Sequence, residues 1–431
     1  MNQNLTDASP STSRPRRARR RHTLGTLAAV GLVAAAVASA CGPATDKADA
    51  TTTVKAAKTP DYRGKLVSVT PLGKLNRGQI SEAVSQWFQG AEASLRHGTA
   101  AYRLEYRTIT PKGRPTTATG LLVIPEVRSR QLTTVLHSHG TLAYRNDAPS
   151  VDPKGLDRLV ASLYASGGRA VVAPDYLGLG KGPGRHPYLH NASAVSASVD
   201  MLRAARKAAP KLGKSLNGDV YGTGFSQGGQ VTMAVGRALG EGHERGWRLR
   251  ALAPVSGPYA IEKDLRTLDE GPTDIAAVSY ITYLLTAQNS VHRLYDSPSE
   301  VFRAPYDKYA DELFDSDHTG EEIVKKLPAT VPELLTDKWY RLLTNPAGNF
   351  QKVLQRIDTT CDWSPKVPVH LYAASGDKDI PIANTRNCAS QLSTHGVTAK
   401  VIDQGAGAVD HFGSFQKSVP QIAQWIDQRE R

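Results

Sequence analysis

The hydrophobic pattern in the first half of the chain predicts strands. Residues 101–108 and 117–124 predict an opening strand pair, joined by a turn at Lys112-Gly113-Arg114-Pro115. Shorter, more uniformly apolar runs are typical of strands buried on both faces, as parallel strands are. These runs are 131–137, 169–173, a run beginning at Val220, and 249–255.

Helical periodicity alternates with these strands. Residues 156–166 and 192–209 carry apolar side chains on one helical face, and Pro210 ends the second segment. A third helix-like segment, 230–237, follows the Val220 strand. This alternation predicts an α/β fold with a mostly parallel central sheet and helices on both faces.

The alternation is interrupted between residues 261 and 361, where we expect a helical cap or lid inserted into the core. The core would then occupy residues 63–260 and 362–431. The predicted cap helices are 273–286, 306–314, 320–326, 331–343 and 350–356. Apolar side chains at helical spacing in the cap fit either an ordinary core or the lining of a substrate pocket. They include Tyr280, Tyr283, Leu284 and Leu285.

After the predicted cap the strand pattern resumes. Strands are predicted at 368–372 and 398–402, with a helix at 383–395 between them. A terminal helix is predicted over 418–426, where Pro420 suits a first helical turn.

The first forty residues predict a secretory signal. An arginine block at 16–21 precedes an apolar run, Leu24–Ala40, that is too short for a comfortable membrane span. Ala38-Ser39-Ala40 fits a cleavage site, although a retained membrane anchor is the alternative. Arg20-Arg21 resembles a twin-arginine signal, so either that route or Sec is possible. The protein is therefore expected to be exported.

Cys41, directly after the small residues, resembles the lipidated cysteine of a bacterial lipobox. Residues 41–62 then predict a tether rich in Thr, Ala, Lys and Asp. The expected location is extracellular, or the outer face of the cell membrane as a lipoprotein.

Composition agrees with export. Cys361 and Cys388 remain as an even pair, and a disulfide between them would contribute about 3 to 4 kcal/mol by the chain-entropy model. Two buried free thiols are the alternative. Removing residues 1–40 takes away six arginines and one aspartate, which lowers the formal net charge from +13 to +8. No basic stripe, zinc finger or helix-turn-helix pattern accompanies this charge, so no nucleic-acid partner is expected.

A candidate nucleophile lies directly after the Val220 strand. Gly224-Phe225-Ser226-Gln227-Gly228 fits G-x-S-x-G between a strand and a helix, the context of a nucleophile elbow. The two glycines are expected because a serine in a strained turn brings neighbouring backbone close. The N–H of Gln227, at the start of the helix, is predicted to stabilise an oxyanion.

Candidates for the acid and the base follow the last two strands. Asp377 and Asp379 both lie in the loop after strand 368–372, and Asp377 is preferred because two registers agree on it. His411 lies in a glycine-rich loop after the last strand. The chain order Ser226, Asp377, His411 predicts a catalytic triad, in which the imidazole takes the serine proton and the carboxylate orients the imidazole.

The second oxyanion donor is expected in the loop after strand 131–137. That loop begins His139-Gly140-Thr141, and the N–H of Thr141 is the first choice of donor. His137 and His139 would also suit a metal pair, but no third ligand is evident and no metal site is predicted. His139 is expected to hold the loop by hydrogen bonds.

These motifs together resemble the secretory lipase and esterase group of the α/β-hydrolases, over residues 65–430. The resemblance also includes Ala173–Gly180 and His186-Pro187-Tyr188-Leu189, while Ala374 departs from the glycine of many members. It implies ester hydrolysis through an acyl-enzyme, on a small-molecule or lipid ester and without a cofactor. The alternatives are a peptidase of the same fold, with an acidic cluster at 311–317 for an amino terminus, and a non-catalytic binding lipoprotein.

Overall fold

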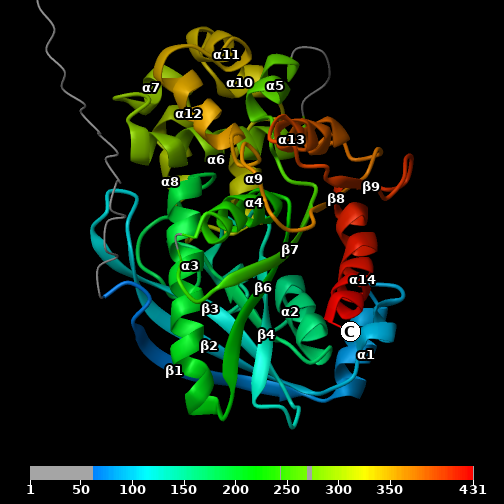
Figure 1. Cartoon of the computed structure of the whole chain (residues 1–431). Helices are drawn as coiled ribbons and strands as arrows, with labels where there is room; N and C mark the ends of the chain where they lie inside the picture. Colours follow the sequence, from blue (N-terminus) through cyan, green and yellow to red (C-terminus); the bar gives the residue numbers. More distant parts are fainter. Residues whose placement is uncertain (1–61, 243, 269–273, 431) are drawn as a thin grey trace, which may run out of the picture. The chain divides into compact units, whose positions relative to one another are not determined.

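The computed structural model describes residues 62–242, 244–268 and 274–430. The predicted signal, Cys41 and nearly all of the predicted tether lie outside the described residues. The described chain contains a nine-stranded sheet in the order β1-β2-β3-β5-β4-β6-β7-β8-β9 (Figure 1). The strands are β1 (Leu66–Leu75), β2 (Thr99–Ile109), β3 (Pro115–Pro125), β4 (Gln131–Ser138), β5 (Ala170–Pro174), β6 (Ser215–Phe225), β7 (Arg248–Val255), β8 (His370–Ala373) and β9 (Lys400–Asp403).

The sheet is antiparallel at one end and parallel over the rest. Strands β1, β2, β3 and β5 pair antiparallel, whereas β5, β4, β6, β7, β8 and β9 pair parallel. The predicted strands are found, and β1 is an additional edge strand. The mostly parallel α/β class is thereby confirmed.

Helices bury both faces of the sheet, as the amphipathic periodicity predicts. On one face α1 (Arg77–Ser85), α2 (Leu156–Ser166) and α14 (His411–Glu430) pack into one hydrophobic cluster. On the other face α3 (Asn191–Ala208) and α4 (Gln227–Gly240) pack into a second cluster. Figure 1 shows α3 along one face of the sheet and α2 and α14 on the opposite side.

The last helix begins earlier than predicted, so two local predictions are wrong. His411 is the first residue of α14 rather than part of the preceding loop, and Pro420 lies inside this helix rather than in its first turn. Phe415, Val419 and Ile422 are buried against the sheet. Burial of this apolar face stabilises the helix. Its contribution outweighs the destabilising effect of a proline in the helix interior.

Between β7 and β8 the chain forms helices above the carboxyl ends of the parallel strands (Figure 1). They are α5 (Ile261–Arg266), α6 (Ile275–His292), α7 (Pro298–Val301), α8 (Ala310–Leu313), α9 (Gly320–Lys326), α10 (Val331–Leu334), α11 (Asp337–Thr344) and α12 (Gly348–Asp358). Their apolar side chains form a hydrophobic cluster of their own. Leu285 is fully buried there, whereas Tyr280 and Leu284 line a cavity described below, so both interpretations of these cap residues hold in part.

A disulfide joins Cys361, after the last cap helix, to Cys388 on α13 (Ile382–Thr394). Both half-cystines are fully buried, beside Met233 and Trp363. The bridge ties the point where the chain leaves the cap to a helix of the core. None of the helices among the described residues is both long and apolar enough to cross a membrane.

Candidate active site

Ser226 lies in a sharp turn between strand and helix. β6 ends at Phe225 and α4 begins at Gln227, and Ser226 between them adopts φ 55° and ψ −122°. A non-glycine residue at positive φ is strained. The glycines on either side are sterically required: a Cβ on Gly224 would overlap the Gly228 carbonyl, and one on Gly228 would overlap the Ser138 carbonyl.

The structure brings Ser226, His411 and Asp377 together. Ser226 Oγ lies 2.9 Å from Nε2 of His411, and Nδ1 of the same imidazole lies 2.7 Å from Oδ2 of Asp377. The three side chains come from the ends of β6 and β8 and from the start of α14. Because Asp377 can only accept when ionised, Nδ1 carries the proton and Nε2 is free to accept one from the serine.

The two candidate aspartates have different environments. Asp377 is 4% exposed and also accepts the N–H of Ile380 at 2.9 Å. Asp379 is more exposed than Asp377 and lines the adjacent cavity, whose walls bury part of its carboxyl and so raise its pKa. The structure therefore places Asp377, the preferred candidate, on the histidine and Asp379 beside the cavity.

The histidine is held by neighbours as well as by Asp377. The ring of Phe225 packs on the imidazole with centroids 4.6 Å apart. Ser414, one turn along α14, donates its hydroxyl to the carbonyl oxygen of His411 at 2.7 Å. The first turn of α14 is thereby fixed beside the elbow.

The loop after β4 lies against the elbow. The Ser138 and His139 carbonyls face Gly228, and Thr141 lines the same cavity as Ser226. Nδ1 of His139 lies 2.7 Å from the carbonyl of Gly140, so His139 holds this loop by hydrogen bonding.

His137 is hydrogen-bonded to a carboxylate. Its Nε2 contacts Asp157 Oδ1 at 2.8 Å. Over the described ranges, no cluster of three or more His, Cys, Asp and Glu side chains is arranged to hold a metal ion.

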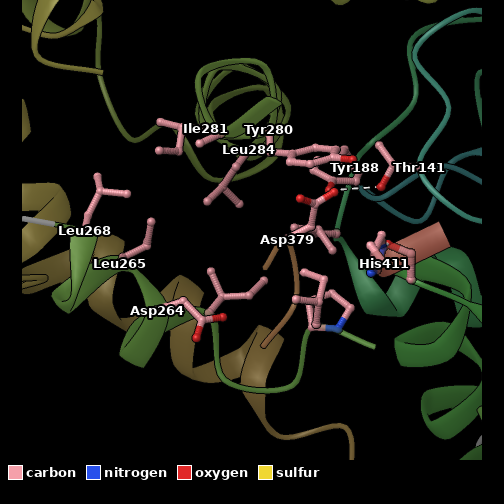
Figure 2. A pocket seen from close by; sticks show the side chains of 16 residues that line it. Thr141, Tyr188, Asp264, Leu265, Leu268, Tyr280, Ile281, Leu284, Asp379 and His411 are labelled. Carbon is pink, nitrogen blue, oxygen red and sulfur yellow. Dashed lines mark hydrogen bonds between the residues drawn. The ribbon is translucent and has the colours of Figure 1, made fainter. Parts of the chain in front are cut away.

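An apolar cavity of about 160 Å³ opens at Ser226 and His411. Figure 2 shows aliphatic side chains from α5, α6 and the chain after α5 on one side of it, and His411, Thr141 and Tyr188 on the other. Asp379 projects between the two groups. The aliphatic side chains are Leu265, Leu268, Ile281 and Leu284.

At the lower wall of this cavity in Figure 2 lies Asp264. Its carboxylate accepts the side-chain amide of Asn384 at 2.8 Å, and burial raises its pKa to about 6. Asp264, Leu265 and Leu268 are site residues that the sequence did not predict. They come from α5 and the chain just after it, which no local motif connects to Ser226.

A strained serine at the end of a central parallel strand, hydrogen-bonded to a histidine that is itself hydrogen-bonded to an aspartate, defines the class of α/β proteins with a nucleophile elbow. The sequence by itself matches no protein-family model and no curated protein. Solved structures do match. A Legionella pneumophila protein assigned as a hydrolase is 26% identical with a TM-score of 0.79, over 85% of this chain and 98% of that one.

The esterase LipA from Xanthomonas oryzae, which degrades rice cell wall, is 29% identical with a TM-score of 0.71, over 85% of this chain and 96% of that one. Candida antarctica lipase A is 16% identical with a TM-score of 0.59, over 81% of this chain and 78% of that one, a likeness of fold. The chain has the α/β-hydrolase fold and resembles esterase-like members of that superfamily.

Proposed function

We propose that this protein hydrolyses carboxylic esters with Ser226 as nucleophile, His411 as base and Asp377 as the orienting acid. The observation that carries the proposal is the continuous hydrogen-bonded chain from Ser226 through His411 to Asp377, at the mouth of an apolar cavity. The similarity to LipA, an esterase, supports the same reaction.

The geometry supports a two-step mechanism. Ser226 Oγ attacks the acyl carbon while His411 Nε2 takes its proton and passes it to the leaving alcohol. Water then attacks the acyl-enzyme with His411 again as base, which releases the acid and restores the serine. Asp377 stabilises the imidazolium formed in each step and keeps its tautomer.

Two backbone N–H groups are proposed to stabilise the oxyanion. Gln227 is the first residue of α4, where N–H groups have no intrahelical acceptor and the helix dipole favours negative charge. Thr141 lies on the facing loop and lines the cavity with Ser226. Hydrogen-bond donors that are held in position before the reaction stabilise the oxyanion and supply a large part of the rate enhancement in acyl transfer.

Substrate class separates esterase from peptidase. We expect p-nitrophenyl esters to be hydrolysed far faster than aminoacyl p-nitroanilides, and a preference for the anilides would favour the peptidase. Three of the four acidic residues considered for an amino terminus already have partners within the protein: Asp311 accepts from Tyr295, Asp315 from His318 and Asp317 from Arg145. A non-catalytic lipoprotein would hydrolyse neither substrate.

The apolar cavity is proposed to hold the acyl chain. Leu284 is 3% exposed and lines the cavity, so Leu284→Trp fills part of it. We expect kcat/KM for p-nitrophenyl octanoate to fall about tenfold or more, while that for the acetate stays within about twofold, because only the longer chain needs this space. Leu284→Met, which conserves volume, is the matched control. Equal losses for both esters would contradict this assignment.

We also propose export, with attachment to a membrane through lipidated Cys41. Small residues before this cysteine and the arginine block before the apolar run support the proposal. Intact mass of the protein purified from its native membrane fraction is expected to correspond to residues 41–431 with added acyl groups. A soluble product cleaved elsewhere, or an unmodified Cys41, would contradict the tether and leave the esterase proposal intact.

A further inference from the structure

The short segment His186–Tyr188, between β5 and α3, contacts both proposed oxyanion residues. The amide nitrogen of the Gln227 side chain lies 3.0 Å from Nε2 of His186, and Nδ1 of that ring lies 2.9 Å from the carbonyl of Leu177. Because a carbonyl only accepts, Nδ1 carries the proton and Nε2 accepts from Gln227. Burial lowers the pKa of His186 to about 3, so the imidazole stays neutral and this arrangement persists at neutral pH.

Tyr188 contacts Thr141, the second proposed oxyanion residue. Its hydroxyl lies 3.2 Å from Oγ1 of Thr141, the contact that is dashed in Figure 2. Burial raises the pKa of Tyr188, so the hydroxyl stays protonated and shares a hydrogen bond with the threonine. The tyrosine ring is fixed in turn by stacking on Tyr283 of α6, with centroids 4.3 Å apart and planes 8° apart.

The cap anchors the same segment. The N–H of His186 donates to Oγ of Ser316 at 3.0 Å, and the side-chain amide of Gln288 donates to the carbonyl of Tyr188 at 2.5 Å. Both proposed oxyanion residues are therefore connected to one segment, and through it to the cap.

We propose that His186 and Tyr188 are positioning residues that set the two oxyanion-hole N–H groups, by holding the side chains of Gln227 and Thr141. The inference rests on the proposed esterase function. Among the described residues, neither side chain is hydrogen-bonded to Ser226, His411 or Asp377. Each limits rotation of a residue whose N–H must lie about 2.7 to 3.1 Å from the oxyanion, and a misplacement of about 1 Å at such a site costs up to roughly 100-fold in rate.

The proposal is tested by substitutions that remove the hydrogen bond of His186 or Tyr188 and leave an aromatic ring in its place. His186→Phe and Tyr188→Phe are each expected to lower kcat about tenfold or more while KM for a p-nitrophenyl ester changes less than about threefold, because the oxyanion exists only after attack. A trifluoromethyl ketone, which Ser226 converts into a hemiketal oxyanion, is expected to lose affinity in proportion to kcat. Tyr295→Phe removes a buried hydroxyl in the cap, bonded to Asp311, and is the control expected to keep kcat.

A substitution of Thr141, the partner of Tyr188, keeps the proposal testable if His186→Phe or Tyr188→Phe does not fold. Thr141→Val removes Oγ1 and keeps the N–H, so it is expected to reproduce Tyr188→Phe, and the double variant to lose little more than either single one. Unchanged kcat and ketone affinity in these variants, or a kcat loss with ketone affinity intact, would overturn the positioning role. Absence of ester hydrolysis in the unmodified protein would instead defeat the proposed function.

Discussion

Ser226→Ala is expected to lower kcat for p-nitrophenyl esters by about 10⁵- to 10⁶-fold, the largest effect of any single substitution in this protein. Without Oγ no acyl-enzyme forms, and only binding and oxyanion stabilisation remain. Alanine keeps the elbow backbone and its neighbours, so the loss is chemical. The measurement is steady-state ester hydrolysis, together with labelling by a fluorophosphonate, which should be abolished.

Ser393→Ala, on the exposed face of α13, is the matched control and should keep both rate and labelling. Circular dichroism should show both variants folded. If Ser226→Ala kept its rate or its phosphonate label, another residue would be the nucleophile and the proposed function would be wrong.

Asp377→Asn is expected to lower kcat about 10⁴-fold. The amide has the size of the carboxylate, but it cannot stabilise the imidazolium, and its NH₂ group favours the wrong tautomer of His411. Because Asp377 is 2.7 Å from Nδ1 and nearly fully buried, no solvent replaces it. The pH–rate profile measured with the same ester should show the loss across the whole range from pH 6 to pH 9.

Asp379→Asn gives the comparison, because it makes the same chemical change two residues away. In the described structure Asp379 lines the cavity and forms no hydrogen bond to His411. The kcat of the Asp379→Asn variant should therefore fall by less than about tenfold. The reverse ranking of the two variants would assign the orienting acid to Asp379.

Much of the fold could be predicted because each element satisfies a local rule. The helix 156–166 and the cap helix 320–326 have the predicted limits: glycines flank the first, and the Thr319 side chain caps the start of the second. β1 and α14 differ from the predicted elements, each for its own reason. β1 is largely exposed, and Pro71 and Gly73 interrupt its strand pattern. α14 continues through Pro420 because its apolar face is buried on the sheet.

The class of fold, the elbow around Ser226, the candidate histidine and two candidate aspartates could all be predicted from the amino-acid sequence. These features depend on short-range chemistry: alternating periodicities, glycines where a turn excludes side chains, and chain order along a parallel sheet.

The three-dimensional fold was needed to show which carboxylate contacts His411 and which cap residues line the cavity. It was also needed to show that His186 contacts Gln227 and that Tyr188 contacts Thr141. Asp377 and Asp379 have the same chemistry and lie in the same loop, and the contact between His186 and Gln227 joins residues 41 positions apart in the sequence. Such choices depend on how strand ends and inserted helices meet in space, which no local pattern in the chain encodes.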